Sequence, residues 1–235
     1  MEWEVLITGD EFDLNELAMS LTMADPAIAK EENGFVLKSS RFGALQDAEA
    51  VRQEAELILT LINGAARMAL GTRQPLSVRN IVLTKDDGSR QHFVYISESI
   101  AFRESISAIV KHADGSEEHI NQADPVAGWI DAGLRDANVA RALRLLSAGQ
   151  LSWVGLYRIL EVVEQDTGSL DHIIQEGWAT DKTLRRFKHS ANSPAAAGDD
   201  ARHGRESTQP PPNPMTLSEA KSLIETILHN WLRTK

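Results

Sequence analysis

The hydrophobic pattern of this 235-residue chain changes near residue 122, and this change restricts the fold more than any other feature. Before that point, apolar residues mostly alternate with polar ones in short runs separated by turn residues, which is typical of β-strands. After it, apolar residues recur at helical spacing over long runs. We therefore predict two domains, an α+β domain over 1–122 and an all-α helical bundle over 123–235.

Short alternating runs and turn residues predict an antiparallel meander in the first domain. Residues 2–8 alternate in polarity, which favours a half-buried strand. One long amphipathic helix is expected over 46–70, because this stretch lacks proline and repeats apolar residues at helical spacing. The hairpin turns are expected at Asn33-Gly34, Lys85-Asp86-Asp87-Gly88 and Asp114-Gly115.

The second domain is expected to contain about four or five helices. The run 125–147 predicts one helix that Pro125 opens, and 151–165 is apolar on nearly every side, as in a central helix. A third helix or pair is expected over 169–189. Thr216 and Glu219 have the spacing of a capping box at the start of the last helix. The tryptophans of this domain are expected in its core: Trp129, Trp153, Trp178 and Trp231.

Acidic residues are concentrated in the first part of the chain. Residues 1–125 contain 21 acidic and 11 basic side chains, whereas residues 126–235 contain 13 of each, so the formal net charge of -10 lies in the first part. A module that binds nucleic acid by neutralising phosphates normally has a basic excess. We therefore expect any RNA site in the second part, and a protein partner is the alternative for the acidic α+β domain.

Composition excludes several classes of protein. The chain has no cysteine, so it has no disulfide, no thiolate metal site and no cysteine nucleophile. No run approaches the roughly 18–20 apolar residues of a membrane span. The acidic start, Met1-Glu2-Trp3-Glu4, is unlike the basic start of a secretion signal. We expect a cytoplasmic protein without membrane contact. No glycine-rich phosphate loop or metal-ligand cluster is visible, so neither a cofactor nor a metal is expected.

The segment 190–215 is the most unusual part of the chain, because it has no evident helix or strand while the other connections in its domain look short. It is polar and rich in Gly, Ser, Asn and Pro. Loops of this length are usually functional or disordered. Three interpretations are open: a flexible linker, an anion or RNA site, and a catalytic site.

Basic residues and histidines around this segment have the chemistry of a metal-independent phosphodiester site. His203 is suited to act as a general acid or base near neutral pH. Arg202 is suited to stabilise the charge that develops on a phosphate, with Asn192 orienting one of the two and His189 as a further candidate. The predicted RNA- or anion-binding residues are Lys182, Arg185, Arg186, Lys188 and Arg205.

The second domain resembles the HEPN superfamily of prokaryotic defence and toxin proteins. The run from Gly198 to Gly204, followed by proline-rich sequence and the helix that starts near Thr216, is similar in layout to the HEPN domains of abortive-infection proteins. The resemblance implies an effector that binds RNA or cleaves it without a metal. It also implies a possible homodimer, since HEPN sites often form across two bundles.

The chain departs from the Arg–His motif of that superfamily. Only three residues separate Arg185 from His189, and Ser207 stands where a motif that starts at Arg202 would place its histidine. The alternative from another class is a non-catalytic protein-interaction or regulatory module built on the helical bundle. A small-molecule pocket has the least support in the sequence, because no cofactor motif is present.

Overall fold

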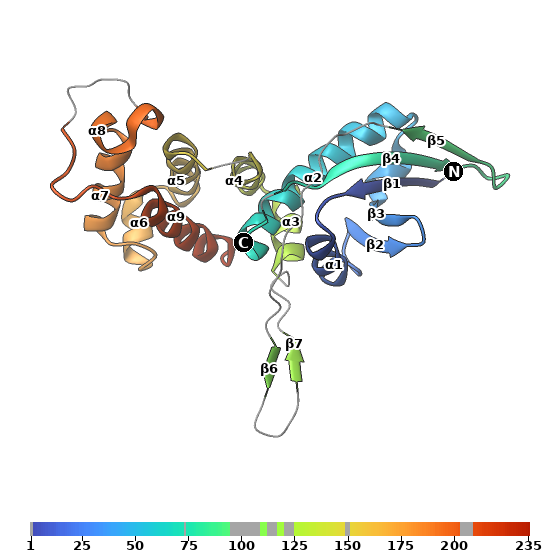
Figure 1. Cartoon of the computed structure of the whole chain (residues 1–235), viewed down its shortest axis with the longest axis horizontal. Helices are drawn as coiled ribbons and strands as arrows, with labels where there is room; N and C mark the ends of the chain where they lie inside the picture. Colours follow the sequence, from blue (N-terminus) through green and yellow to red (C-terminus); the bar gives the residue numbers. More distant parts are fainter. Residues whose placement is uncertain are drawn as a thin grey trace. The chain divides into compact units, whose positions relative to one another are not determined.

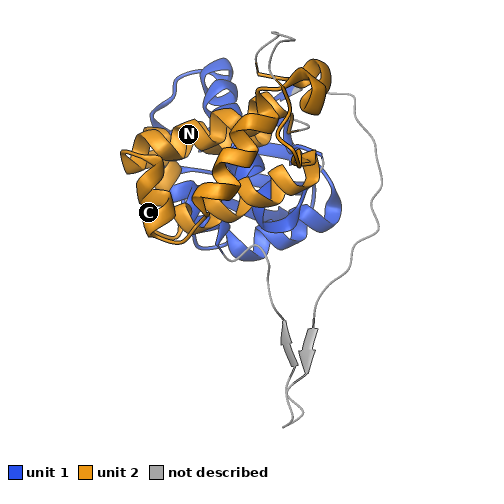
Figure 2. Cartoon of the chain, turned by 90° about the vertical axis from the view of Figure 1, so that its left-hand side faces the viewer, with its two compact units in different colours: residues 1–131 blue, residues 132–235 orange. Residues whose placement is uncertain are grey.

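The computed structural model describes residues 2–72, 74–94, 109–111, 117–119, 125–148, 151–202 and 209–235. It contains an antiparallel five-stranded sheet in the first part of the chain, followed mostly by helices. The chain divides into two compact units, Met1–Asp131 and Ala132–Lys235, coloured separately in Figure 2. This division falls within helix α3 (Val126–Arg135), whereas the sequence pattern predicted a boundary at residue 122.

The sheet of the first unit is antiparallel, as predicted, but it is not a simple meander. Its strand order is β2-β3-β1-β4-β5, so the first strand occupies the centre between the third and the fourth (Figure 1). In a meander, neighbouring strands would follow the sequence order. The strands are β1 (Glu2–Thr8), β2 (Ala27–Glu31), β3 (Gly34–Lys38), β4 (Ser77–Thr84) and β5 (Arg90–Val94).

The connection from β3 to β4 contains the predicted long helix, α2 (Ala48–Leu70), which packs against β4 and β1. The Asp47 carboxylate caps its first turn by accepting a hydrogen bond from the Ala50 amide, and Gly71 ends it with φ of 65°. Apolar residues of α2 at helical spacing are buried, and so are Trp3, Val5 and Ile7 on one face of β1. The sheet therefore buries one face under α2, as the alternation in the sequence predicted.

Smaller elements complete the first unit. Helix α1 (Glu11–Ser20) links β1 to β2, and the 3₁₀ helix η1 (Ser40–Ala44) follows β3. In the β2–β3 hairpin the turn residues are Glu32 and Asn33, one position earlier than predicted, because Gly34 already pairs with Glu31. The predicted turn between β4 and β5 is confirmed, with Gly88 at φ of 79°.

A third hairpin pairs β6 (Ile109–Lys111) with β7 (Glu117–His119) in a separate two-stranded sheet. This antiparallel pairing surrounds the turn that the sequence predicted at Asp114-Gly115. The turn residues themselves lie outside the described part of the chain.

The second unit is mostly helical, but the structure differs from the prediction in two places. The predicted helix over 125–147 is two helices, α3 and α4, because the Asp136 carboxylate accepts hydrogen bonds from the Asn138 and Val139 amides and so caps a new helix. The segment 190–215 begins with a short helix and a 3₁₀ turn, which the sequence analysis missed. The elements are α4 (Ala137–Ser147), α5 (Trp153–Thr167), α6 (Leu170–Gln175), α7 (Asp181–Ala191), α8 (Pro194–Ala197), η2 (Gly198–Asp200) and α9 (Leu217–Leu232).

Other predictions for this part of the chain are confirmed. Thr216 and Glu219 form the capping box of α9, each accepting a hydrogen bond from the other's amide. The predicted core tryptophans Trp129, Trp153, Trp178 and Trp231 are all buried, but Trp129 belongs to the first unit and not to the second. Among the helices that the structure describes, none is long and apolar enough to cross a membrane.

A partly buried carboxylate joins three helices of the second unit. Asp166, near the end of α5, accepts hydrogen bonds from the Asn138 amide group at 3.0 Å and from the Trp231 indole at 2.8 Å. The Lys235 ammonium lies 2.7 Å from the same carboxylate and 2.8 Å from Asp136. Asp166 therefore connects α4, α5 and α9 through charged hydrogen bonds.

We expect this connection to make the stability of the second unit sensitive to acid. Burial alone would raise the pKa of Asp166, but the hydrogen bonds from Lys235, Trp231 and Asn138 outweigh it and lower the pKa below the ordinary value of 3.8. Because the pKa of Asp166 is lower in the folded state, the ionised carboxylate stabilises the folded state at pH values above the ordinary pKa. This stabilisation is lost as the pH falls through the folded-state pKa.

Asp166→Asn should therefore lower the free energy of unfolding by about 1–3 kcal/mol at neutral pH. The difference from the parent protein should shrink as the pH falls from about 5 to about 3. Denaturant unfolding at a series of pH values measures this difference in the free energy of unfolding. The exposed Asp171→Asn variant on α6 serves as the control, since no described residue forms an ion pair with Asp171. A gap that stays constant down to pH 3 would contradict this role for Asp166.

Candidate functional site

Several of the predicted site residues meet at one tyrosine of α5. We call this group the Tyr157 cluster, and it consists of Tyr157, Glu161 and Glu164 on α5, Lys188 on α7, and Arg202 in the segment after η2. The three α5 residues are spaced four and three positions apart, so they lie along one face of the helix. The cluster belongs entirely to the second unit.

Arg202 is fixed in this cluster by three contacts. Its guanidinium carbon lies 4.0 Å from the centre of the Tyr157 ring, and its Nη2 donates to Glu161 Oε1 at 2.6 Å. Its backbone amide donates to the Ala191 carbonyl at 2.8 Å, which returns the chain to the end of α7. These contacts orient the guanidinium while its side chain stays 33% exposed, so part of it faces solvent.

Lys188 approaches the same ring from α7. Its ammonium lies 6.0 Å from the centre of the Tyr157 ring and 4.0 Å from Glu164 Oε2. The side chain of Lys188 is 32% exposed. Two cations from different parts of the chain therefore lie near one aromatic ring, and each has a carboxylate of α5 as its partner.

Asn192 lies next to this group at the end of α7. It follows Ala191, whose carbonyl binds the Arg202 amide. The side-chain oxygen of Asn192 is buried and has no hydrogen-bond partner within the described residues. Asn192 is thus close to Arg202 in the structure.

The remaining members of the basic cluster have other contacts. The Arg186 guanidinium binds the Glu219 carboxylate at 3.0 Å and donates to the Asn213 and Pro214 carbonyls. His189 Nε2 donates to the Gln209 carbonyl at 2.7 Å. These two side chains of α7 hold the returning part of the 190–215 segment in place. In the described part of the chain they do not contact the Tyr157 cluster.

Arg185 and Lys182 also lie away from the cluster. Arg185 forms an exposed ion pair with Asp181 on its own helix, at 2.8 Å. Lys182 is exposed and forms no ion pair with any described residue. His203 and Arg205, which were predicted as catalytic and RNA-binding residues, lie outside the described residues.

Sequence reasoning missed the contribution of α5. It treated this helix as a purely apolar core element, and seven of its residues are indeed buried. The spacing of Tyr157, Glu161 and Glu164 was the signal that was available, since it puts two acidic side chains on the same stripe of the helix as the buried Tyr157 ring. Among the described residues, no group of three or more histidine or acidic side chains is placed to hold a metal ion.

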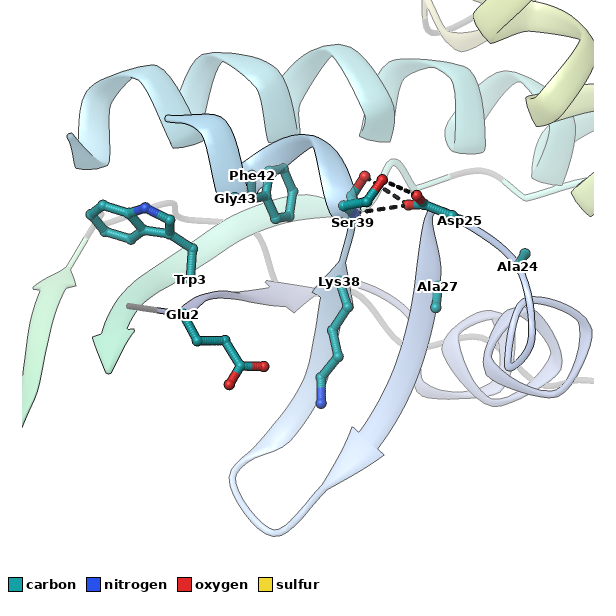
Figure 3. Close-up of a pocket in the computed structure, with 10 residues that line it drawn as sticks. Glu2, Trp3, Ala24, Asp25, Ala27, Lys38, Ser39, Phe42 and Gly43 are labelled. Carbon is teal, nitrogen blue, oxygen red and sulfur yellow. Dashed lines mark hydrogen bonds between the residues drawn. The ribbon is translucent and has the colours of Figure 1, made fainter. Parts of the chain in front are cut away.

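The first unit contains a pocket that the sequence analysis did not find. It has a volume of about 400 Å³ and lies near one end of β1 and β3, beside η1 (Figure 3). Trp3 and Phe42 provide its aromatic wall, and both are largely buried. The polar residues that line the pocket are Glu2, Asp25, Lys38, Ser39 and Ser40.

The chain was compared with family models, curated proteins and solved structures. No match was found in any of the three comparisons.

Proposed function

We propose that the second unit binds RNA at the Tyr157 cluster, as a HEPN-like RNA-binding or metal-independent RNA-cleaving effector. The proposal includes the helical-bundle architecture of that superfamily for this part of the chain. One observation carries it: Arg202 and Lys188, both predicted as phosphate ligands from the sequence, lie near the same Tyr157 ring. The predicted Asn192 lies next to them.

Binding of a phosphate requires the two cations to exchange their carboxylate partners. Glu161 and Glu164 hold Arg202 and Lys188 in ion pairs that are about a third or more exposed, and such pairs contribute only about 0–1 kcal/mol. A guanidinium that binds phosphate oxygens makes charge-assisted hydrogen bonds that are individually stronger. Stacking on Tyr157 keeps the Arg202 guanidinium oriented during the exchange.

The charge distribution favours the second unit for such binding. The acidic excess lies within residues 1–125, which would repel RNA, whereas residues 126–235 contain equal numbers of acidic and basic residues. We propose RNA as the ligand, rather than another polyanion, because the layout of residues 198–219 resembles that of HEPN domains. In cleavage, the ribose 2′-oxygen would attack phosphorus and the bond to the 5′-oxygen would break, with His203 transferring protons and Arg202 stabilising the phosphate charge.

Arg202→Ala should weaken binding of a fluorescein-labelled single-stranded RNA by about tenfold, since one lost charged hydrogen-bond contact costs about 1.5 kcal/mol. Fluorescence anisotropy measures the affinity. Arg141→Ala is the matched control, because Arg141 is an exposed arginine of α4 that forms no ion pair with any described residue. Equal weakening by both variants would show only nonspecific attraction and would contradict the site.

Cleavage is tested on the same RNA in EDTA. Cleavage by the parent protein and by Arg141→Ala, but not by an Arg202→Ala/His203→Ala variant of equal thermal stability, identifies a ribonuclease. Binding without cleavage identifies an RNA-binding protein. Cleavage that the double variant retains at full rate places the activity elsewhere.

A non-catalytic interaction module is the second candidate, and a different observation favours it. Arg186 and His189 bind the backbone of residues 209–214, so part of the predicted basic cluster fixes a surface segment. A fixed segment of this kind suits contact with a protein partner or with a second copy of the chain. Light scattering distinguishes a homodimer from a monomer, and this candidate predicts no RNA affinity above that of the Arg202→Ala variant.

A further inference from the structure

The two cations of the Tyr157 cluster are already bound by carboxylates of their own chain. Arg202 Nη2 donates to Glu161 Oε1 at 2.6 Å, and the Lys188 ammonium lies 4.0 Å from Glu164 Oε2. Carboxylate and phosphate oxygens compete for the same charged N–H groups, because both accept charge-assisted hydrogen bonds from them. Each cation that is proposed to bind phosphate is therefore paired with an acidic side chain of α5.

Glu161 is the stronger of the two competitors. Its contact with Arg202 is a hydrogen-bonded ion pair, whereas the 4.0 Å between Lys188 and Glu164 exceeds the length of a hydrogen bond. The Glu161 and Arg202 side chains are 44% and 33% exposed, so an RNA strand can reach the pair. The guanidinium also stacks on the Tyr157 ring, and this contact does not involve Glu161. Loss of the carboxylate therefore leaves the guanidinium in position.

We propose that Glu161 is autoinhibitory: its carboxylate pairs with Arg202 in the resting protein and lowers the affinity of the Tyr157 cluster for RNA. This inference rests on the proposed RNA site and adds its regulation. An RNA phosphate must displace the carboxylate before it binds the guanidinium. The displaced carboxylate stays on α5 beside the site, where its negative charge opposes the phosphate. Release of Glu161 from Arg202 therefore raises the affinity for RNA.

Glu161→Gln tests this competition without removing the hydrogen-bond acceptor. The amide oxygen of glutamine still accepts a hydrogen bond from Arg202, so only the negative charge is lost. The Kd for fluorescein-labelled single-stranded RNA should fall about fivefold, which corresponds to the upper end of what an exposed ion pair contributes. Fluorescence anisotropy at one fixed salt concentration measures the Kd.

Glu225→Gln is the matched control for the loss of one negative charge. Glu225 is an exposed glutamate of α9 that forms no ion pair with any described residue. Its substitution reduces only the general repulsion of RNA, so the Kd should fall less than about twofold. Unchanged thermal unfolding temperatures show that both variants are folded.

The double variant Glu161→Gln/Arg202→Ala separates competition from general repulsion. If the carboxylate acts by pairing with Arg202, its loss should improve binding less than about twofold once the guanidinium is absent. If it acted by general repulsion alone, Glu161→Gln would give the same gain in the parent protein and in Arg202→Ala.

The outcomes distinguish this inference from the proposed function. Autoinhibition is overturned if Glu161→Gln binds RNA no more tightly than Glu225→Gln, or if its gain persists in the Arg202→Ala background. Failure of the RNA site itself has a different result, because Arg202→Ala would then bind RNA as tightly as the parent protein. If neither the parent protein nor Glu161→Gln binds RNA, both proposals are overturned. A gain for Glu161→Gln that Arg202→Ala abolishes supports both.

Discussion

Replacing Phe187 by alanine should lower the free energy of unfolding of the second unit by about 3–5 kcal/mol. Phe187 lies on α7 with a fully buried side chain. Its ring centre lies 6.0 Å from that of Trp153 and 5.9 Å from that of Tyr157, both on α5. The substitution removes the aromatic contact between these two helices and leaves a cavity between them.

Two further variants provide the comparison for Phe187→Ala. Phe187→Leu fills most of the cavity, so it should cost only about 1–2 kcal/mol. Lys182→Ala, at an exposed position of the same helix, should change stability by less than about 0.5 kcal/mol. Urea unfolding measures all three variants. A loss below about 1 kcal/mol for Phe187→Ala would contradict the packing of α7 on α5, and with it the position of Lys188 beside Tyr157.

The second large effect is expected for RNA affinity. Lys188→Ala/Arg202→Ala should raise the Kd for single-stranded RNA about 100-fold, because two charged phosphate contacts of about 1.4 kcal/mol each are removed. The two residues share the Tyr157 ring, so their effects are coupled and the single variants must be measured beside the double variant. Fluorescence anisotropy at one fixed salt concentration gives the comparison.

The matched control removes the same charge from another helix. Arg141 and Arg144 are exposed residues of α4 for which no ion pair with a described residue occurs. Arg141→Ala/Arg144→Ala should therefore weaken binding no more than about threefold, through the loss of general attraction alone. If this control weakens binding as strongly as Lys188→Ala/Arg202→Ala, the Tyr157 cluster is not the site.

Local signals in the sequence predicted the local structure well. Thr216 and Glu219 satisfy each other's amides within a single turn, so their spacing alone identified the capping box. The helix break at Asp136 was missed because apolar residues continue at helical spacing on both sides of it. Only the hydrogen bonds that Asp136 accepts from the next turn reveal the new start.

Features that depend on distant contacts could not be read from the sequence. Alternation identified β1 as a strand but says nothing of its neighbours, so the central place of β1 between β3 and β4 was not predicted. The same limit applies to the site. Arg202 and Lys188 were named as candidates, but their carboxylate partners lie on α5, far away in sequence, and only the folded chain brings them together.

The salt dependence of RNA binding tests the phosphate site most directly. For single-stranded nucleic acid, each phosphate contact contributes a slope of about 0.7 to the plot of log affinity against log salt concentration. We predict that Lys188→Ala/Arg202→Ala lowers this slope by about 1.4 relative to the parent protein, while Arg141→Ala/Arg144→Ala lowers it much less. Parallel plots for the parent protein and Lys188→Ala/Arg202→Ala would show that neither cation contacts a phosphate, which would contradict the proposed site.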